Sequence, residues 1–394
     1  MKKESIETQE NLNKNTQNTR PIKKTRAKFT KQWKKRYIPI ISSFAAAFFI
    51  CLALVFIIPT KHENATDGIQ NNSSWPAKVI APFIDTTYWV PLNSSYSLGG
   101  VANVGKVAEE TDLRYFNFAF INPSTNTPTS SDGTINWCWG GYDSLGKNST
   151  SDNQYQGILQ SMQSVKDIGG DITISVGGQL GKAPWVVSNN EQKLYEMYKD
   201  IVETYGIKRL DLDIEESNQG EKENQINARA IKRLQDETGI DIILTIPIMP
   251  DGWKDKQLKV INAYLDAGVE ITLINSMTMC YGYGVAANED YGDASVRAME
   301  SANKQMIELY KARNITLTEQ QAYARMGATV AIGYDSDLYP TFTSPMAQKV
   351  ARHAKEKSYG MLSFWSVGRD AQLQYNKGVN SKYEFLNVMY EYLG

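Results

Sequence analysis

The sequence of 394 residues predicts a closed (β/α)8 TIM barrel preceded by a single N-terminal transmembrane helix, and three observations lead to this expectation. From residue 78 onward, short runs rich in β-branched and aromatic residues alternate with longer amphipathic segments. The alternation recurs eight times over about 315 residues, a length that suits such a barrel with some loop insertions. An uncharged apolar run stands before this region, near the N-terminus.

The expected elements follow one another in pairs along the second part of the chain. The strands are short β-rich runs, and they fall at 79–85, 115–121, 171–176, 209–215, 241–248, 270–279, 327–332 and 360–366. The helices repeat apolar residues every three or four positions, and they fall at 155–168, 191–205, 224–237, 255–267, 293–312, 344–357 and 382–392. A doubly wound open sheet is the alternative, but it usually has fewer strands and a phosphate-binding loop after its first strand. No such loop follows Asp85.

The apolar run predicts a membrane anchor. Residues 37–58 contain no charged side chain, and as an α-helix they would extend about 33 Å, enough to cross a hydrocarbon layer of about 30 Å. Lys and Arg crowd residues 23–36, and such a positive flank stays in the cytoplasm. A cleaved signal peptide is the alternative, although its apolar core is normally shorter, about 7–15 residues. We expect a single-pass protein of the cell membrane with its body outside, or a secreted protein if the segment is cleaved.

Charge and composition divide the chain further. We expect residues 1–36 to form a basic cytoplasmic tail, 37–59 the signal anchor, 60–77 a linker and 78–394 the barrel. Residues 1–59 carry twelve Lys and Arg against three Asp and Glu, whereas residues 60–394 carry 30 against 40. An acidic body argues against nucleic-acid binding, which needs a basic face. The two histidines are too few for the usual zinc sites, so neither a metal nor a cofactor is expected.

Three acidic residues alternate at the end of the fourth expected strand: Asp211, Asp213 and Glu215. Successive side chains on a strand point to opposite faces, so these three share one face at intervals of about 6.6 Å. Leu212 and Ile214 on the other face would pack against helices, which directs the carboxylates into the barrel. Neighbouring buried carboxylates raise at least one pKa, and a raised pKa makes a general acid near neutral pH, as protonation of a glycosidic oxygen requires.

Tryptophans gather at the same expected end of the barrel. Six of the eight lie just after an expected strand or at its end: Trp89, Trp137, Trp139, Trp185, Trp253 and Trp365. Flat indole faces stack well on the apolar faces of sugar rings, so together they favour a carbohydrate cleft. Alternatives stay open for both features, since an acidic strand end can be solvated or bind a cation, and a single tryptophan more often packs in a core.

At these residues the sequence resembles glycoside hydrolase family 18, the chitinase family, and especially the bacterial chitinase-D-like group. The likeness runs from about residue 78 to the C-terminus and covers all eight expected strands. The motifs that carry it are Ala81-Pro82-x-x-Asp85, Ser175-x-Gly177-Gly178, Asp211-x-Asp213-x-Glu215, Leu244-Thr245-x-Pro247-x-x-Pro250, Asn275-x-Met277-Thr278-Met279-Cys280-Tyr281-Gly282 and Trp365. Lys208 and Arg209 replace the Asp-Gly with which the family's acidic motif begins.

The resemblance implies a glycosidase barrel at 78–394 that hydrolyses β-1,4-linked N-acetylglucosamine polymers, such as chitin, with retention of configuration. In this family the nucleophile is the acetamido oxygen of the substrate. Carried over, Glu215 is the acid and base, Asp213 orients the acetamido group and Asp211 tunes the charge of Asp213. Tyr281 would hydrogen-bond near the acetamido group. The residues expected to bind substrate are Trp365, which would form the floor under the sugar, with Trp139, Trp89, Trp185, Met279, Gly177 and Gly178.

Cys280 is the clearest departure from the family pattern, because related proteins usually carry Asp at this position. Loss of that carboxylate removes a hydrogen-bond partner and a negative charge beside the acid. We therefore expect a weaker enzyme or one with an altered pH optimum, and restoring Asp at Cys280 should change the rate or the pH profile. A Cys138–Cys280 disulfide is conceivable outside the cell, although nothing in the sequence brings the two together.

Other functions are compatible with the same residues. A barrel that binds sugar with little or no turnover is one alternative, which Cys280 slightly favours and the intact Asp213 and Glu215 oppose. An endo-N-acetylglucosaminidase acting on N-glycans or on peptidoglycan is another, because both substrates carry N-acetyl groups. The expected partners are therefore an N-acetylglucosamine-containing glycan and, through residues 37–58, the membrane.

Overall fold

The computed structural model describes residues 75–394. The expected cytoplasmic tail, signal anchor and nearly all of the linker lie outside the described residues, so these three assignments stay predictions. Within residues 75–394, no helix combines the length and apolar character that crossing a bilayer requires.

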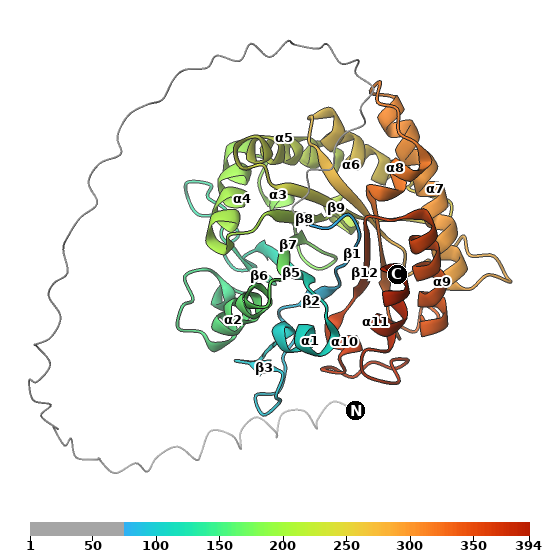
Figure 1. The fold of residues 1–394 in the computed structure, drawn as a ribbon. Helices are drawn as coiled ribbons and strands as arrows, with labels where there is room; N and C mark the ends of the chain where they lie inside the picture. The colour runs from blue at the N-terminus through green and yellow to red at the C-terminus, as the bar shows by residue number, and fades with distance from the viewer. Residues whose placement is uncertain (1–74) are drawn as a thin grey trace, which may run out of the picture. The chain divides into compact units, whose positions relative to one another are not determined.

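Eight strands close into a parallel barrel, which confirms the predicted fold (Figure 1). The first strand is split in two, and the last strand pairs with both parts, Met361 beside Val79 and Trp365 beside Phe83. All contacts between neighbouring barrel strands are parallel. In chain order the strands are β1 (Val79–Ile80) with β2 (Phe83–Asp85), β5 (Tyr115–Pro123), β7 (Asp171–Gly177), β8 (Arg209–Asp213), β9 (Asp241–Pro247), β10 (Ile271–Met277), β11 (Met326–Ala331) and β12 (Met361–Trp365).

Helices surround the barrel on the outside, as Figure 1 shows. The long ones are α2 (Asn153–Asp167), α4 (Glu191–Tyr205), α5 (Glu221–Thr238), α6 (Asp255–Asp266), α7 (Tyr291–Lys311) and α9 (Ser344–Lys357). The sequence predicted all six, and α4 and α9 begin and end at the expected residues. The last expected helix is present as α11 (Glu384–Met389) followed by a 3-10 turn.

Short elements are the ones that the sequence pattern missed. They are the hairpin β3 (Ser97–Leu98) with β4 (Val101–Ala102), β6 (Trp137–Trp139), which pairs antiparallel with β5, and the helices α1 (Val104–Thr111), α3 (Pro184–Val187), α8 (Glu319–Ala324) and α10 (Val367–Asp370). One or two turns of helix give too few repeats for a periodic pattern, and tertiary contacts decide their conformation.

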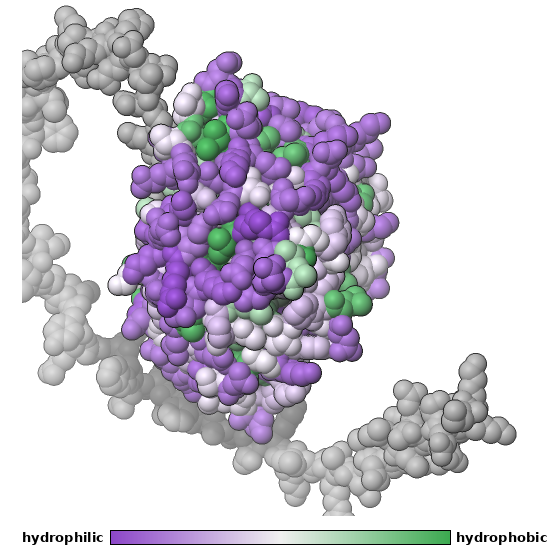
Figure 2. Space-filling view, turned by 90° about the vertical axis from the view of Figure 1, so that its right-hand side faces the viewer, coloured by the Kyte–Doolittle hydropathy of each residue, from purple (hydrophilic) through white to green (hydrophobic). Residues whose placement is uncertain are grey.

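Helix α4 illustrates why the long helices form where they do. The side chain of Asn190 accepts a hydrogen bond from the Lys193 amide at the N-terminus, and Gly206 ends the helix in a left-handed conformation with φ of 57°. Leu194, Tyr198 and others on one face are buried, and each such side chain contributes about 1.5–3 kcal/mol. The opposite faces are solvated: the side of the barrel that bears α7 and α9 is mostly hydrophilic, with scattered hydrophobic residues (Figure 2).

The interior of the barrel is packed in layers of different chemistry. Arg209 of β8 lies at the floor, where its guanidinium is 4.3 Å from the centre of the Trp75 ring and pairs with Asp241 at 3.0 Å. A small apolar layer follows, which includes Val79, Ala81, Ile243, Leu273 and Met361. Polar residues fill the next layer and the mouth. The chemistry is therefore confined to the carboxyl ends of the strands.

Candidate active site

The three predicted carboxylates lie together at the carboxyl end of β8. Asp211 and Asp213 are buried, with 1% and 3% of their surfaces exposed, and Glu215 just beyond the strand is partly exposed. Glu215 keeps an extended backbone (φ −114°, ψ 164°), so the alternation of the strand continues and all three point inward. Glu215 and Asp213 are hydrogen-bonded to each other. Oδ1 of Asp213 is buried without a hydrogen-bond partner.

Burial sets the protonation of this cluster. It raises the pKa of Asp211 to about 7 and the pKa of Glu215 to about 7, and together with the charges of Glu215 and Asp211 it raises the pKa of Asp213 well above its usual range. Two adjacent carboxyls that share a hydrogen bond titrate as a pair, so a proton remains between Asp213 and Glu215 near neutral pH. The cluster can thus supply a general acid in that pH range.

A chain of hydrogen bonds crosses the barrel interior and ends on Asp211. Ser175 of β7 donates to its Oδ2 at 2.5 Å, and Thr245 of β9 donates to its Oδ1 at 2.6 Å. Asn275 of β10 donates to the Thr245 hydroxyl at 3.0 Å, and Thr329 of β11 donates to the Asn275 carbonyl oxygen at 2.9 Å. Every donor points toward Asp211, so both of its oxygens are engaged and its orientation is fixed. The Ser175 and Thr245 donors also lower the pKa of Asp211, against the effect of burial.

Gly177 and Gly178 have a structural role in the backbone at the end of β7. Both have positive φ, 116° and 90°. A Cβ on Gly177 would lie 2.2 Å from the carbonyl oxygen of Asp213, to which the amide of Gly178 donates at 3.0 Å. These glycines therefore let β7 approach the acidic strand closely. Their expected contact with substrate stays a prediction.

Trp365 lies at the end of β12 and is partly exposed, and its expected place under a sugar stays a prediction. Its ring stacks on Phe120 with 5.6 Å between centroids and 13° between planes, and Phe83 lies 6.3 Å from both. The Phe120 ring would contact a Cβ on Gly178 at 2.9 Å, which places this aromatic floor beside the acidic strand. The sequence analysis did not identify Phe120 as a site residue. It lies at a register shift between β5 and β7, where the regular alternation of inward and outward side chains is interrupted.

Two of the tryptophans expected to bind substrate are core residues instead. Trp139 and Trp185 are 0% and 1% exposed, so neither offers a face to a sugar. The Trp139 indole donates to the Tyr205 hydroxyl at 2.9 Å and the Trp185 indole to the Asn218 carbonyl at 2.8 Å. Trp139 of β6 and Trp185 of α3 both pack into the main hydrophobic core of the domain. Trp137 and Trp253 are buried as well.

Exposed apolar side chains replace them around the mouth. Trp89 is 52% exposed, and the others that follow barrel strands are Tyr88, Leu92, Tyr142, Leu180, Tyr283, Leu338 and Tyr375. All lie in loops at the carboxyl ends of strands, where a ligand approaches. Five of these eight are aromatic, and tyrosine outnumbers tryptophan. The useful signal in the sequence was therefore an aromatic residue of any type in a loop that follows a strand, and not tryptophan in particular.

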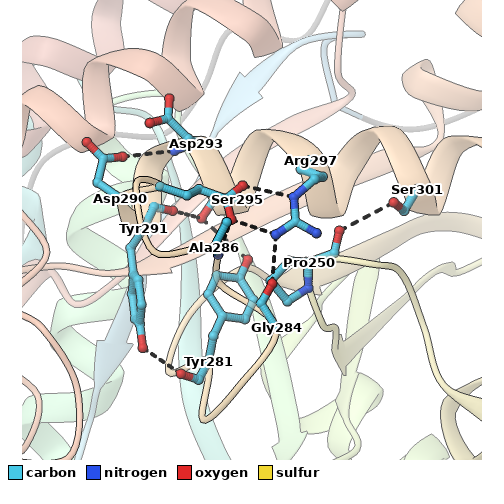
Figure 3. A network of polar contacts seen from close by, with 11 residues as sticks. Pro250, Tyr281, Gly284, Ala286, Asp290, Tyr291, Asp293, Ser295, Arg297 and Ser301 are labelled. Atoms are coloured by element: carbon cyan, nitrogen blue, oxygen red, sulfur yellow. Dashed lines mark hydrogen bonds and ion pairs between the residues drawn. The ribbon is translucent and has the colours of Figure 1, made fainter.

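Tyr281 does not face the carboxylates. It is 3% exposed, its hydroxyl donates to Ser295 of α7 at 3.4 Å, and Tyr291 donates to its carbonyl at 2.6 Å (Figure 3). Its expected hydrogen bond near an acetamido group is thus corrected, since packing against α7 turned the side chain outward. Met279, two residues earlier, is half-buried, and its contact with substrate stays a prediction.

Cys280 also departs from one expectation. Cys280 and Cys138 are both free thiols, so the conceivable disulfide is absent. Cys138 is buried in β6, whereas Cys280 follows β10 and donates to the carboxylate of Asp335 at 3.5 Å. Burial and the Asp335 charge raise the pKa of the Cys280 thiol to about 12, so the thiol is neutral. No group of three or more His, Cys, Asp or Glu side chains within residues 75–394 is arranged to hold a metal ion.

Known proteins with related sequences are chitinases by name. No protein-family model matches the chain. It is 27% identical over 310 residues to a probable bifunctional chitinase/lysozyme of Escherichia coli (strain K12), a match that covers 75% of this chain and 31% of that protein. It is 26% identical over 309 residues to endochitinase 11 of Metarhizium anisopliae, covering 75% of this chain and 53% of that protein. The chain thus spans about a third to a half of these curated relatives.

Solved structures agree in fold. The catalytic domain of a hyperthermophilic chitinase from Pyrococcus furiosus has a TM-score of 0.65 at 23% identity, covering 81% of this chain and 95% of that one. The Group IV chitinase of Ostrinia furnacalis in complex with allosamidin has a TM-score of 0.52 at 11% identity, covering 80% and 98%. In sequence and in fold, the chain is therefore chitinase-like, with the barrel of chitinase-type glycoside hydrolases.

Proposed function

We propose that the barrel hydrolyses β-1,4-linked N-acetylglucosamine polymers, chitin or chito-oligosaccharides, by a retaining mechanism in which the substrate's own acetamido group is the nucleophile. The observation that carries the proposal is the buried, unpartnered Oδ1 of Asp213 beside the acid Glu215. A buried carboxylate oxygen without a donor is costly, and an acetamido N–H at this point would satisfy it.

The proposed reaction divides the work among the three carboxyls. Glu215 donates its proton to the glycosidic oxygen as the bond to C1 breaks, while the acetamido oxygen attacks C1 and forms a cyclic oxazolinium-like intermediate. Asp213 holds the acetamido N–H and balances the positive charge of the intermediate. Glu215, now ionised, takes a proton from water, which attacks C1 and reopens the ring. Asp211, held by Ser175 and Thr245, places a negative charge beside Asp213 and so raises the pKa of Asp213.

The aromatic floor fits the same substrate. The stacked Trp365 and Phe120 rings form an apolar surface beside the acids, on which the apolar face of a sugar ring could stack. The exposed aromatic residues on the surrounding loops would stack on neighbouring sugars of a chain, which favours a polymer over a monosaccharide. On its motifs we place the chain with the chitinase-D-like bacterial group.

Replacement of Glu215 tests the function directly. We expect the full-length protein to hydrolyse a fluorogenic chito-oligosaccharide and Glu215→Gln to lose about 10²–10⁴-fold in kcat, the usual contribution of a positioned acid and base. Glu216→Gln is the matched control, because Glu216 is adjacent but exposed and outside the inward alternation. Equal activity of both variants, or binding of the oligosaccharide without any hydrolysis by the wild type, would overturn the proposal and favour a sugar-binding barrel.

Peptidoglycan is the second candidate substrate, because the E. coli relative is named as a chitinase and a lysozyme. Peptidoglycan and N-glycans both carry the N-acetyl group that the proposed mechanism uses. Product analysis on chitin, peptidoglycan and a high-mannose glycoprotein would separate the three substrates. Cleavage of a glycan without N-acetyl groups at an equal rate would exclude the acetamido nucleophile.

We also propose that residues 37–58 anchor the protein in the cell membrane with the barrel outside. The support is the length of the uncharged run and the basic residues before it. Fractionation of cells, followed by protease treatment of intact cells, tests it: the barrel should be in the membrane fraction and accessible from outside. A barrel found only in the medium would indicate that the segment is cleaved.

A further inference from the structure

A carboxylate that the motifs do not contain lies at the mouth of the site. Asp335 belongs to the loop after β11, and its Oδ2 accepts a hydrogen bond from the Cys280 thiol, after β10, at 3.5 Å. Its Oδ1 pairs with Nη2 of Arg369, in α10 after β12, at 3.1 Å. Three successive loops at the carboxyl end of the barrel thus meet at one carboxylate, whose two oxygens are both engaged.

The cation that holds Asp335 is itself fixed. The side chain of Arg369 is only 13% exposed, and its Nη1 donates to the carbonyl oxygen of Ile332 at 3.4 Å. The side chain of Asp335 is 33% exposed, so this carboxylate is open toward the mouth on one side.

We infer that Asp335 is a positioning residue of the active site: it supplies, from the seventh strand's loop, the negative charge that faces Glu215, while the neutral Cys280 serves only as its hydrogen-bond donor. This inference rests on the proposed function, because its kinetic test measures the proposed hydrolysis. On this inference, the charge that Cys280 lacks comes from a neighbouring loop, through the carboxylate of Asp335.

The groups that face Glu215 give the sign of the effect. Burial is the largest cause of its raised pKa, the hydrogen bond from Asp213 lowers it, and the charges of Glu216 and Asp335 raise it. Cys280 is uncharged and Arg369 lies behind Asp335, paired with it. Removal of the Asp335 charge therefore lowers the pKa of Glu215, and the unpaired Arg369 acts in the same direction. The acid would then lose its proton at lower pH.

Moving the charge between two positions tests the inference. We expect Asp335→Asn to shift the basic limb of the kcat/KM profile of the full-length protein to lower pH by about half a unit to one unit, since the carboxylate is partly solvated. Cys280→Asp in the Asp335→Asn background should return the limb to its wild-type position. Cys280→Asp alone should shift it to higher pH, because two carboxylates then lie beside Glu215.

Asp337→Asn is the matched control, because Asp337 is exposed in the same loop and loses the same charge. Its profile should coincide with that of the wild type. Titration of the 13C-labelled glutamate carboxyls by NMR follows Glu215 without any substrate, so it reports even if the oligosaccharide is not hydrolysed. Failure of hydrolysis by the wild type would overturn the proposed function alone. A Glu215 titration that is identical in the wild type, Asp335→Asn and Asp337→Asn would overturn this inference alone.

Discussion

Strand β8 carries charged residues into the barrel at two levels, and the two levels differ in how the charges are balanced. At the floor, Arg209 pairs with Asp241 at 3.0 Å and stacks on Trp75, whose indole donates to Asp171 at 2.9 Å. At the mouth, Asp211, Asp213 and Glu215 follow at the same spacing. Hydroxyls and neighbouring carboxyls surround these three acids.

The two levels therefore differ in role: the charges at the floor stabilise the fold, and the charges at the mouth are suited to chemistry. Buried charges that are paired with an opposite charge stay ionised and hold the structure together, whereas buried like charges keep a proton near neutral pH. Burial is the largest cause that raises the pKa of Glu215 to about 7, and the negative charges of Glu216 and Asp335 add to it. A proton held near pH 7 is what a general acid requires, so the imbalance itself indicates the functional level of the barrel.

Breaking the pair at the floor should have the largest effect on stability. Arg209→Met removes the ion pair with Asp241 and the stacking on Trp75, so we expect a loss of about 3–5 kcal/mol in the free energy of unfolding. Urea denaturation measures it. Arg229→Met is the matched control, because its ion pair with Glu191 is exposed and should contribute less than about 1 kcal/mol. Equal midpoints for the two variants would contradict the comparison.

The pH dependence of kcat/KM should reflect the protonation of Glu215 at the mouth. The ion pair at the floor should not affect it. We expect kcat/KM to fall about tenfold per pH unit above pH 7, because Glu215, with a pKa of about 7, must be protonated to act as the acid. Its raised pKa also means that folding is favoured most at low pH and loses this contribution as pH rises through 7. A basic limb well above pH 8 would contradict the raised pKa of Glu215.

The smallest expected effect concerns the hydrogen-bond chain on Asp211. Thr245→Val removes a donor to Asp211 and an acceptor for Asn275, so we expect kcat to fall about tenfold and the pKa of Asp211 to rise. Thr173→Val is the matched control, because the Thr173 hydroxyl, also buried, has no hydrogen-bond partner. It should leave kcat unchanged and the stability equal or higher. Equal kcat values for both variants would show that the chain does not contribute.

The sequence predicted what depends on local periodicity. Eight strands, six long helices and the inward face of Asp211, Asp213 and Glu215 follow from the alternation of apolar and polar residues, which burial enforces along each element. Tyr281 shows the limit of a motif. Its place after β10 matched the family, yet packing on α7 decided the direction of its side chain.

Long-range contacts could not be predicted from the residues alone. Trp139 and Trp185 follow strands as cleft residues do, but β6 and α3, which carry them, pack so that both indoles are buried in the main hydrophobic core. Phe120 stacks on Trp365 from a register shift between β5 and β7. Asp335 meets Cys280 from 55 residues away in the sequence.

The sequence by itself thus determined the barrel and the row of acids on one strand. The spacing of apolar residues along an element, and the face of a strand on which each residue lies, are local properties that burial makes unambiguous. Only the tertiary structure decided which aromatic residues are exposed on the loops after the strands and which carboxylate contacts Cys280. The physical reason is that closing the barrel brings together loops from distant strands, and the side chains they share are selected by packing and charge rather than by sequence spacing.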